Sequence, residues 1–265
     1  MADDAESEIA PQVVREAVAS IEAGGSAAAK SMIHAVEAGG DEEKALVLLA
    51  ECAATSPLVA TQLLDAGCVR SLLPHLDPAR SSKRSTELVL RVFSALSTQP
   101  NTTERMLKDG LLPPLLSLTH TASDAIGMRI AALLHNLADT PANRFRLVHE
   151  RTLTVLTHML VNPAGSGSLK EHGLQAAASI AGFPTEELSF PQLLGRLCES
   201  KLPGQQREAM ACLAIIADKT PEHRARLGQV PDIARGLVCA AGSSDAKCSS
   251  EAHELLDLFG VRQNS

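Results

Sequence analysis

Tryptophan and tyrosine are absent from this 265-residue chain, and its aromatic side chains are five phenylalanines. Proteins that bind single-stranded nucleic acid stack the bases on aromatic side chains and present a basic surface to the phosphates. The chain has few aromatics and a formal net charge of −7, so we expect no nucleic-acid binding. Its core must be built from Leu, Ala, Val, Ile and Met, and abundant Ala and Leu favour helices over strands.

Segments that direct a protein into or across a membrane are also missing. No apolar run approaches the ~18 residues that a bilayer span needs. The first ten residues, MADDAESEIA, are acidic and lack the apolar stretch of a signal peptide. We predict a disordered acidic tail at 1–8, a cytoplasmic protein without membrane insertion, and reduced cysteines. Nuclear, cytoskeletal or ciliary association stays open.

Motifs that carry catalysis are missing as well. The sequence has no G-x-x-x-x-G-K-[ST] phosphate loop and no G-x-S-x-G elbow, and its nine histidines do not cluster at metal-ligand spacing. The S-x-x-K match at Ser244 to Lys247 lies in a polar stretch, 242–250, that we predict to be a loop. The sequence therefore predicts a protein that is not an enzyme and has no cofactor, metal or small-molecule substrate.

An evenly spaced series of prolines organises the chain. Pro57, Pro100, Pro141, Pro184 and Pro221 follow apolar helical runs at intervals of 43, 41, 43 and 37 residues. Such intervals are typical of helical solenoids, whose repeats are about 40–47 residues long. Each proline is predicted to begin a short helix, which a corner separates from a second helix and a long Ala- and Leu-rich third helix. Pro184 departs from this pattern, because Pro191 interrupts the segment that should be the first helix of its unit.

The register divides the chain into six units and a short tail. The units are 9–56, 57–99, 100–140, 141–183, 184–220 and 221–260, and the tail is 261–265. Together the six units are predicted to form a single domain, 9–260.

Three helices per unit, with a short proline-led first helix, resemble the armadillo repeat family. The family's closing A-L-x-N-Φ signature is best matched by Leu134-His135-Asn136-Leu137-Ala138. The resemblance covers nearly the whole chain. It implies an all-α, right-handed α-solenoid of about six three-helix repeats that binds protein partners.

The family's best-defined binding surface is the concave groove lined by the third helices. Nuclear import receptors carry a Trp and an Asn there, four residues apart in successive repeats. Of the matching positions in this chain only Asn136 fits, so a nuclear import receptor is not expected. The resemblance implies a shallow, mostly apolar groove, for which the predicted partner-binding residues are Arg91, His135, Asn136, Gln175 and Ser179. Its small apolar residues could equally pack against neighbouring repeats.

The leading interpretation is a non-catalytic interaction scaffold or adaptor that binds a partner helix or extended segment in this groove. Two alternatives stay open. One is an Hsp70 nucleotide-exchange co-chaperone of the armadillo type, which the corner TPEHRARL at 220–227 weakly resembles. The other is a structural scaffold of the cytoskeleton or cilium. The sequence does not identify the partner.

Two basic features are interpreted as solvated surface. The corner NLADTPANRFRL at 136–147 recurs as IADKTPEHRARL at 216–227, which repeats a pair of arginines after each proline. Partial recurrence elsewhere indicates an exposed helix face. The basic stretch 80–84 is predicted to be a solvated loop, with phosphorylation or contact with an anionic partner as alternatives.

Overall fold

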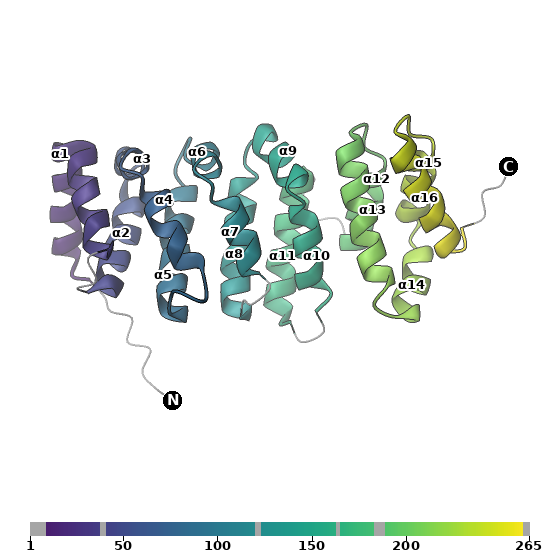
Figure 1. Cartoon of the computed structure of the whole chain (residues 1–265), viewed down its shortest axis with the longest axis horizontal. Coiled ribbons are helices and arrows are strands. Elements are labelled where there is room, and N and C mark those ends of the chain that lie inside the picture. The colour runs from purple at the N-terminus through teal and green to yellow at the C-terminus, as the bar shows by residue number, and fades with distance from the viewer. Residues whose placement is uncertain (1–8, 38–40, 120–122, 163–164, 183–188, 262–265) are drawn as a thin grey trace. The chain divides into compact units, whose positions relative to one another are not determined.

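The computed structural model of the chain describes residues 9–37, 41–119, 123–162, 165–182 and 189–261. Within these ranges the chain forms sixteen α-helices and one 3-10 helix, and no β-strand (Figure 1). The predicted all-α class is confirmed. The helices divide into two compact units, Met1–Leu137 and Ala138–Ser265. The predicted tail at 1–8 lies outside the described residues, as do 262–265.

The first unit contains three successive groups of helices. They are α1 (Pro11–Glu37) and α2 (Glu42–Thr55); α3 (Pro57–Asp65), α4 (Cys68–Leu72), η1 (Leu73–Leu76) and α5 (Lys83–Ser97); and α6 (Thr103–Lys108), α7 (Leu112–Leu118) and α8 (Asp124–Leu137). Gly25 kinks α1 with a φ of 60°, so α1 consists of two helical segments. The long third helices α2, α5 and α8 pack against one another in succession.

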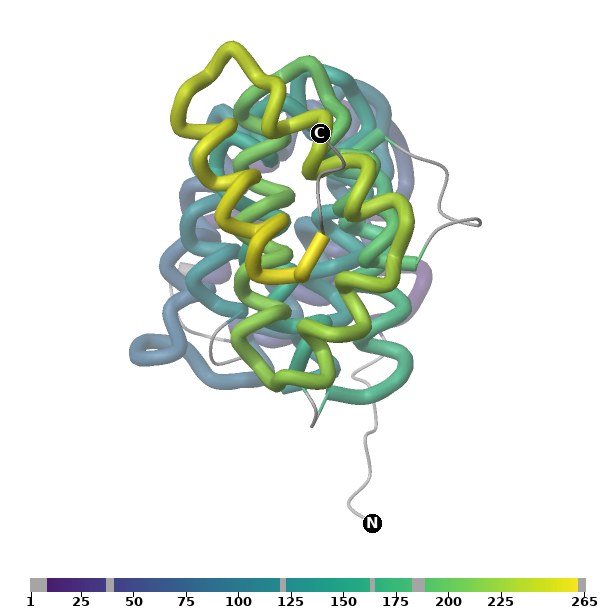
Figure 2. Tube along the Cα trace, turned by 90° about the vertical axis from the view of Figure 1, so that its right-hand side faces the viewer, coloured from purple at the N-terminus to yellow at the C-terminus, as the bar shows by residue number. Residues whose placement is uncertain are grey.

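The second unit repeats the pattern with one departure. Its helices are α9 (Pro141–His149), α10 (Thr152–Leu160) and α11 (Gly167–Ala181); α12 (Phe190–Cys198) and α13 (Pro203–Ala217); and α14 (Pro221–Gly228), α15 (Pro231–Ala241) and α16 (Ala246–Leu258). Figure 2 views this unit from its C-terminal side, with α14 to α16 nearest the viewer in light green to yellow. The unit predicted at 184–220 shows two helices in its described part, and Pro191 lies in the first turn of α12.

Three of the spaced prolines begin helices as predicted. Pro57, Pro141 and Pro221 each follow a Ser or Thr whose side-chain oxygen accepts the N–H three residues ahead, at 3.2 to 3.3 Å. This side chain satisfies an N–H that the first turn leaves unpaired. The prediction for Pro100 is wrong. Gln99, which precedes it, cannot cap in this way, and the chain makes a turn before α6 begins at Thr103.

The polar stretch 242–250 is only partly the loop predicted from its composition. Asp245 accepts the backbone N–H of Cys248 at 2.8 Å, and this cap starts α16 at Ala246. The loop prediction for 80–84 holds for 80–82 and fails for Lys83 and Arg84, for the same reason. Ser82 caps α5 by accepting the N–H of Ser85 at 3.0 Å, which places Lys83 and Arg84 in the first helical turn. In both cases one capping side chain decides where a polar segment becomes helical.

Leucine and alanine fill the core, as the composition requires. Phe93 is the one aromatic side chain that is fully buried in the described part of the chain. Small residues allow close helix packing where α12 crosses α15. A Cβ atom built on Gly236 would lie 2.0 Å from the carbonyl oxygen of Gly195, so the two backbones meet at this crossing.

Candidate functional site

The predicted site residues in the first unit link successive third helices. Arg91 on α5 forms an ion pair with Glu51 on α2. Asn136 on α8 donates from Nδ2 to Oγ of Ser97 on α5, at 2.9 Å. His135 is half-buried beside it. Arg91 and Asn136 therefore already have partners within the protein, and a ligand would have to compete with these contacts.

Gln175 and Ser179 lie one turn apart on α11 in the second unit. Oγ of Ser179 donates to the carbonyl oxygen of Gln175 at 3.0 Å, which is a bond within the helix. The Gln175 side chain is exposed. The five predicted residues are divided between the two units, so their place in one common groove stays a prediction.

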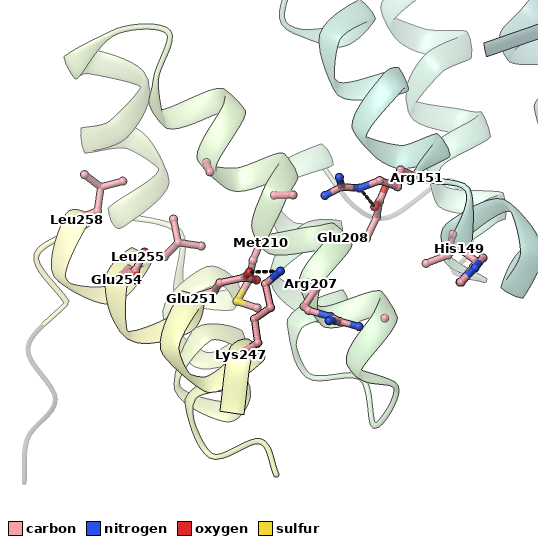
Figure 3. Close-up of a pocket in the computed structure, with 14 residues that line it drawn as sticks. His149, Arg151, Arg207, Glu208, Met210, Lys247, Glu251, Glu254, Leu255 and Leu258 are labelled. Carbon is pink, nitrogen blue, oxygen red and sulfur yellow. Dashed lines mark ion pairs between the residues drawn. The ribbon is translucent and has the colours of Figure 1, made fainter. Parts of the chain in front are cut away.

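A groove of about 760 Å³ lies in the second unit, between α13 and α16 and beside the C-terminal end of α9 (Figure 3). Its lining residues come from these three helices and the α9–α10 corner. They are Val148, His149, Arg151, Gly204, Arg207, Glu208, Met210, Ala211, Ala214, Lys247, Glu251, Glu254, Leu255 and Leu258. The sequence predicted only part of the position of this groove.

Small and apolar side chains make up part of the groove lining. Ala211 and Ala214 on α13 line it, and Leu255 and Leu258 on α16 line it from the other side. The short alanine side chains leave room above α13 that a larger residue would fill.

Glu208 is a buried carboxylate that holds α10 and α13 together. Its Oε1 accepts the backbone N–H of Thr154 at 2.8 Å and the Thr154 hydroxyl at 3.0 Å. Thr154 lies in the first turn of α10, so Glu208 satisfies an N–H that the helix leaves free and interacts favourably with the helix dipole. Burial raises the pKa of Glu208, although the bonds from Thr154 and the charge of Arg151 oppose the rise.

The rim of the groove carries opposite charges at its two sides. Arg151 is 71% exposed, and its Nε lies 3.8 Å from Glu208. Arg207 is exposed too, and no carboxylate of the described residues forms an ion pair with it. On α16, Lys247 and Glu251 approach to 3.9 Å. Glu254 stands one turn farther along α16, so the groove is cationic toward α9 and acidic along α16 (Figure 3).

An exposed aromatic pair continues the cationic side of the groove. Phe145 on α9 is 61% exposed. Its ring stacks on that of His149, with 6.5 Å between the centroids and 12° between the planes. Because His149 also lines the groove, the aromatic surface and the groove are contiguous. Large exposed apolar side chains beside a concave site are typical of interaction surfaces.

A helical spacing in the sequence could have located this groove. Gly204, Arg207, Ala211 and Ala214 recur every three or four residues, which places them on one face of α13. Lys247, Glu251, Glu254 and Leu258 recur in the same way on α16. The second series was missed because the predicted loop at 242–250 removed Lys247 from the helix.

The repeated arginines are not all as solvated as predicted. Arg144 donates from Nε to the carbonyl oxygen of Ala138 at 2.8 Å and from Nη2 to that of Asp139 at 3.3 Å. Arg105, after Pro100, pairs with Asp65 and donates to the carbonyl oxygen of Leu64. These two arginines satisfy carbonyl groups at helix ends. Arg144 is half-buried, whereas Arg105 stays 43% exposed, so the interpretation as solvated surface holds for Arg105 and is incomplete for Arg144.

The basic stretch 80–84 is paired with acidic side chains. Arg80 lies 3.3 Å from Asp77. Lys83 lies 3.8 Å from Glu87, and Arg84 lies 3.8 Å from Glu43. An anionic partner would have to displace these carboxylates.

The six cysteines are free, and five of them are buried. Burial raises the pKa of the Cys68 and Cys212 thiols to about 12, which keeps them protonated at neutral pH. Among the residues that the structure describes, no three His, Cys, Asp or Glu side chains are placed to hold a metal ion. Over the same residues, no helix combines the length and the apolar character that crossing a bilayer requires.

Comparison with known proteins identifies the fold. The sequence matches no family model and no curated protein. It is similar in structure to a designed armadillo repeat protein, with 19% identity, a TM-score of 0.55, and coverage of 87% of this chain and 99% of that one. Computationally designed armadillo repeat proteins for modular peptide recognition match with 20% identity, a TM-score of 0.54 and coverage of 87% and 99%. A designed armadillo repeat protein in complex with the peptide (KR)4 matches with 18% identity, a TM-score of 0.55 and coverage of 87% and 98%.

These likenesses show that the chain has the fold of armadillo-repeat proteins, an all-α solenoid. The fold prediction is confirmed.

Proposed function

We propose that this protein is a non-catalytic scaffold that holds a peptide segment of a partner protein in the groove between α13 and α16. The observation that carries the proposal is the groove itself, which follows one face of a third helix. Two of the similar structures are armadillo designs made for peptide recognition or solved with a peptide. Their likeness supports this use of the fold.

The lining of the groove suits a peptide. Protein interfaces combine an apolar centre with a polar rim, and here the alanines and leucines are flanked by charged side chains. The volume of about 760 Å³ is within the range of about 300–1,000 Å³ that ligand sites occupy. An extended segment exposes its backbone N–H and C=O groups, which the charged rim can bind while apolar side chains rest on α13 and α16.

Filling the groove tests the proposal. Peptides that bind the wild-type protein are selected from a random dodecamer library, and their affinities are measured by fluorescence polarisation. Ala214→Arg places a long side chain in the groove and should weaken the selected peptides by tenfold or more, roughly the loss of a buried contact of about 1.4 kcal/mol. Ala225→Arg, at an exposed position on α14 outside the groove, is the matched control and should change nothing.

Unchanged affinity in Ala214→Arg, with helical circular dichroism intact, would show that peptides bind elsewhere. The predicted residues Arg91, His135, Asn136, Gln175 and Ser179 would then be the next surface to test. Replacing Ser179 with a bulky residue and reversing the charge of Arg91 would test the two units separately. The co-chaperone alternative, the cytoskeletal or ciliary alternative and the cytoplasmic location stay predictions.

A further inference from the structure

We infer that the segment held in the α13–α16 groove is acidic, with an Asp or Glu carboxylate bound between Arg151 and Arg207 and apolar neighbours resting on Ala211 and Ala214. This inference rests on the proposed function and names the chemistry of the partner. Its basis is the division of charge around the groove and the number of arginine donors that the protein leaves unused.

Arg151 has an unusual backbone conformation, and its guanidinium makes few contacts within the protein. It precedes α10 with a φ of 59°, in the left-handed region that few residues with a side chain adopt. Its one acidic neighbour, Glu208, already accepts two bonds from Thr154. The 3.8 Å between Nε of Arg151 and Glu208 is beyond hydrogen-bond distance. The guanidinium of Arg151 therefore keeps its donors for a ligand.

Arg207 adds a second guanidinium to the groove. It lies on α13 and lines the groove, as Arg151 does. Figure 3 shows the Arg207 side chain extending toward the side of the groove where His149 lies. Arg207 forms no ion pair with a described carboxylate, so its guanidinium is available to bind an acidic group of a ligand. A guanidinium binds a carboxylate through two parallel N–H bonds, which a lysine cannot reproduce.

The opposite rim gives the segment a direction. Lys247 is close to Glu251, so these two charges largely offset each other. Glu254 then leaves an excess of negative charge on α16, which disfavours an acidic side chain there. An acidic residue is therefore favoured at the α9 side of the groove and disfavoured along α16. The exposed ring of Phe145, stacked on His149, offers an apolar contact for the residue next to the carboxylate.

The experiment compares peptides selected from the same random dodecamer library by three proteins. These are the wild type, the groove variant Arg151→Glu/Arg207→Glu, and the control variant Arg196→Glu/Arg226→Glu. The control carries the same change in net charge as the groove variant. Arg196 and Arg226 are exposed in the same unit and lie outside the groove. Wild type and control should enrich Asp and Glu, and the groove variant should lose this enrichment.

Affinities then measure the effect on one peptide. Replacing the enriched Asp or Glu with Asn or Gln should weaken binding to the wild type roughly 1.5- to fivefold, the range for an ion pair at an exposed rim. The same replacement should have no effect on the Arg151→Gln/Arg207→Gln protein, and it should strengthen binding to the Arg151→Glu/Arg207→Glu protein because it removes a repulsion between like charges. Arg151→Gln/Arg207→Gln gives a variant without reversed charge, and circular dichroism of each protein checks that the helices remain.

The outcomes separate the two proposals. If selected peptides are displaced by Ala214→Arg but show no acidic enrichment, the groove binds peptides and the acidic partner is wrong. If acidic enrichment survives in both the Arg151→Glu/Arg207→Glu and the Arg151→Gln/Arg207→Gln variants, Arg151 and Arg207 do not bind the carboxylate. The inference is then wrong as well. If no peptide is sensitive to Ala214→Arg, the proposed function and this inference fall together.

Discussion

Gly236 should be intolerant of even one added methyl group, although it lies inside a helix. Replacing glycine with alanine in a helix interior ordinarily stabilises it by about 1 kcal/mol. At Gly236 on α15, however, the new Cβ would lie 2.0 Å from the carbonyl oxygen of Gly195 on α12 and 2.9 Å from Cβ of Cys198. Ordinary carbon–oxygen contacts are about 3.3 Å or longer. The two helices would have to separate by more than 1 Å, or the backbone would have to distort.

The cost follows from what this crossing buries. Leu193, Leu197, Ile233 and Leu237 are fully or almost fully buried on the two helices. A gap of about 0.5–1 Å removes a quarter to a half of the dispersion energy of a contact, and overpacking in a core costs typically about 1–3 kcal/mol. After the gain of about 1 kcal/mol in helix propensity we expect a net loss of about 1 kcal/mol in the free energy of unfolding. In a protein of this size that lowers the melting temperature by roughly 2–4 °C.

Circular dichroism at 222 nm is the suitable probe, because the chain has no tryptophan or tyrosine to report by fluorescence. Gly204→Ala is the matched control. Gly204 is an exposed residue in the first turn of α13, and a Cβ there meets nothing within 4 Å. Its melting temperature should stay the same or rise. A rise for Gly236→Ala as well would refute the close approach of α12 and α15.

Four further predictions concern three side chains. Glu208→Ala should lower the free energy of unfolding by about 1–3 kcal/mol, because the Thr154 N–H loses its acceptor in a buried place, whereas Glu208→Gln keeps an acceptor and should lose less. Because the pKa of Glu208 is raised in the folded state, this carboxyl binds its proton more tightly folded than unfolded. The free energy of unfolding of the wild type, relative to that of Glu208→Gln, should therefore fall as pH rises from about 4.5 toward 8. Urea titrations of both proteins at the two pH values measure this difference, and an increase with pH would contradict the raised pKa. Cys239 has the exposed thiol, so one thiol per chain should react quickly with Ellman's reagent at pH 8. The five buried thiols should react only on unfolding, and rapid reaction of several thiols in the folded protein would contradict their burial. Phe145→Ala should leave the melting temperature unchanged within about 1 °C and lower the affinity for the selected peptides severalfold. A lower melting temperature of the peptide-free variant would instead show that Phe145 stabilises the fold.

Prediction from sequence succeeded for features that depend on local chemistry. The Ser-Pro and Thr-Pro pairs at Pro57, Pro141 and Pro221 begin helices because cap and proline act within one turn. Prediction failed at Pro100 and at 242–250, where a neighbouring residue decided the outcome. Gln99 could not supply a cap, and Asp245 supplied one inside a stretch whose composition is typical of a loop.

The candidate site was predicted only in outline. The sequence pointed to the third helices, but on them it favoured Arg91 and Asn136, whose side chains pair with Glu51 and Ser97. Such pairs join residues about 40 positions apart, and no local pattern reveals which polar side chains a fold will pair. That Arg207 forms no ion pair with a described carboxylate could be recognised only once its surroundings were known.

The sequence by itself determined the all-α class, the repeat period and the positions of most helices, because periodic apolar residues, caps and prolines act over a few residues. Tertiary structure decided which charges remain available. Glu208 is bonded to Thr154, while Arg207 beside it in the sequence is left without an ion pair among the described carboxylates. It also decided that Gly195 and Gly236, 41 residues apart, must both lack a side chain. Burial and pairing depend on which helices meet, and that is a property of the packed repeats.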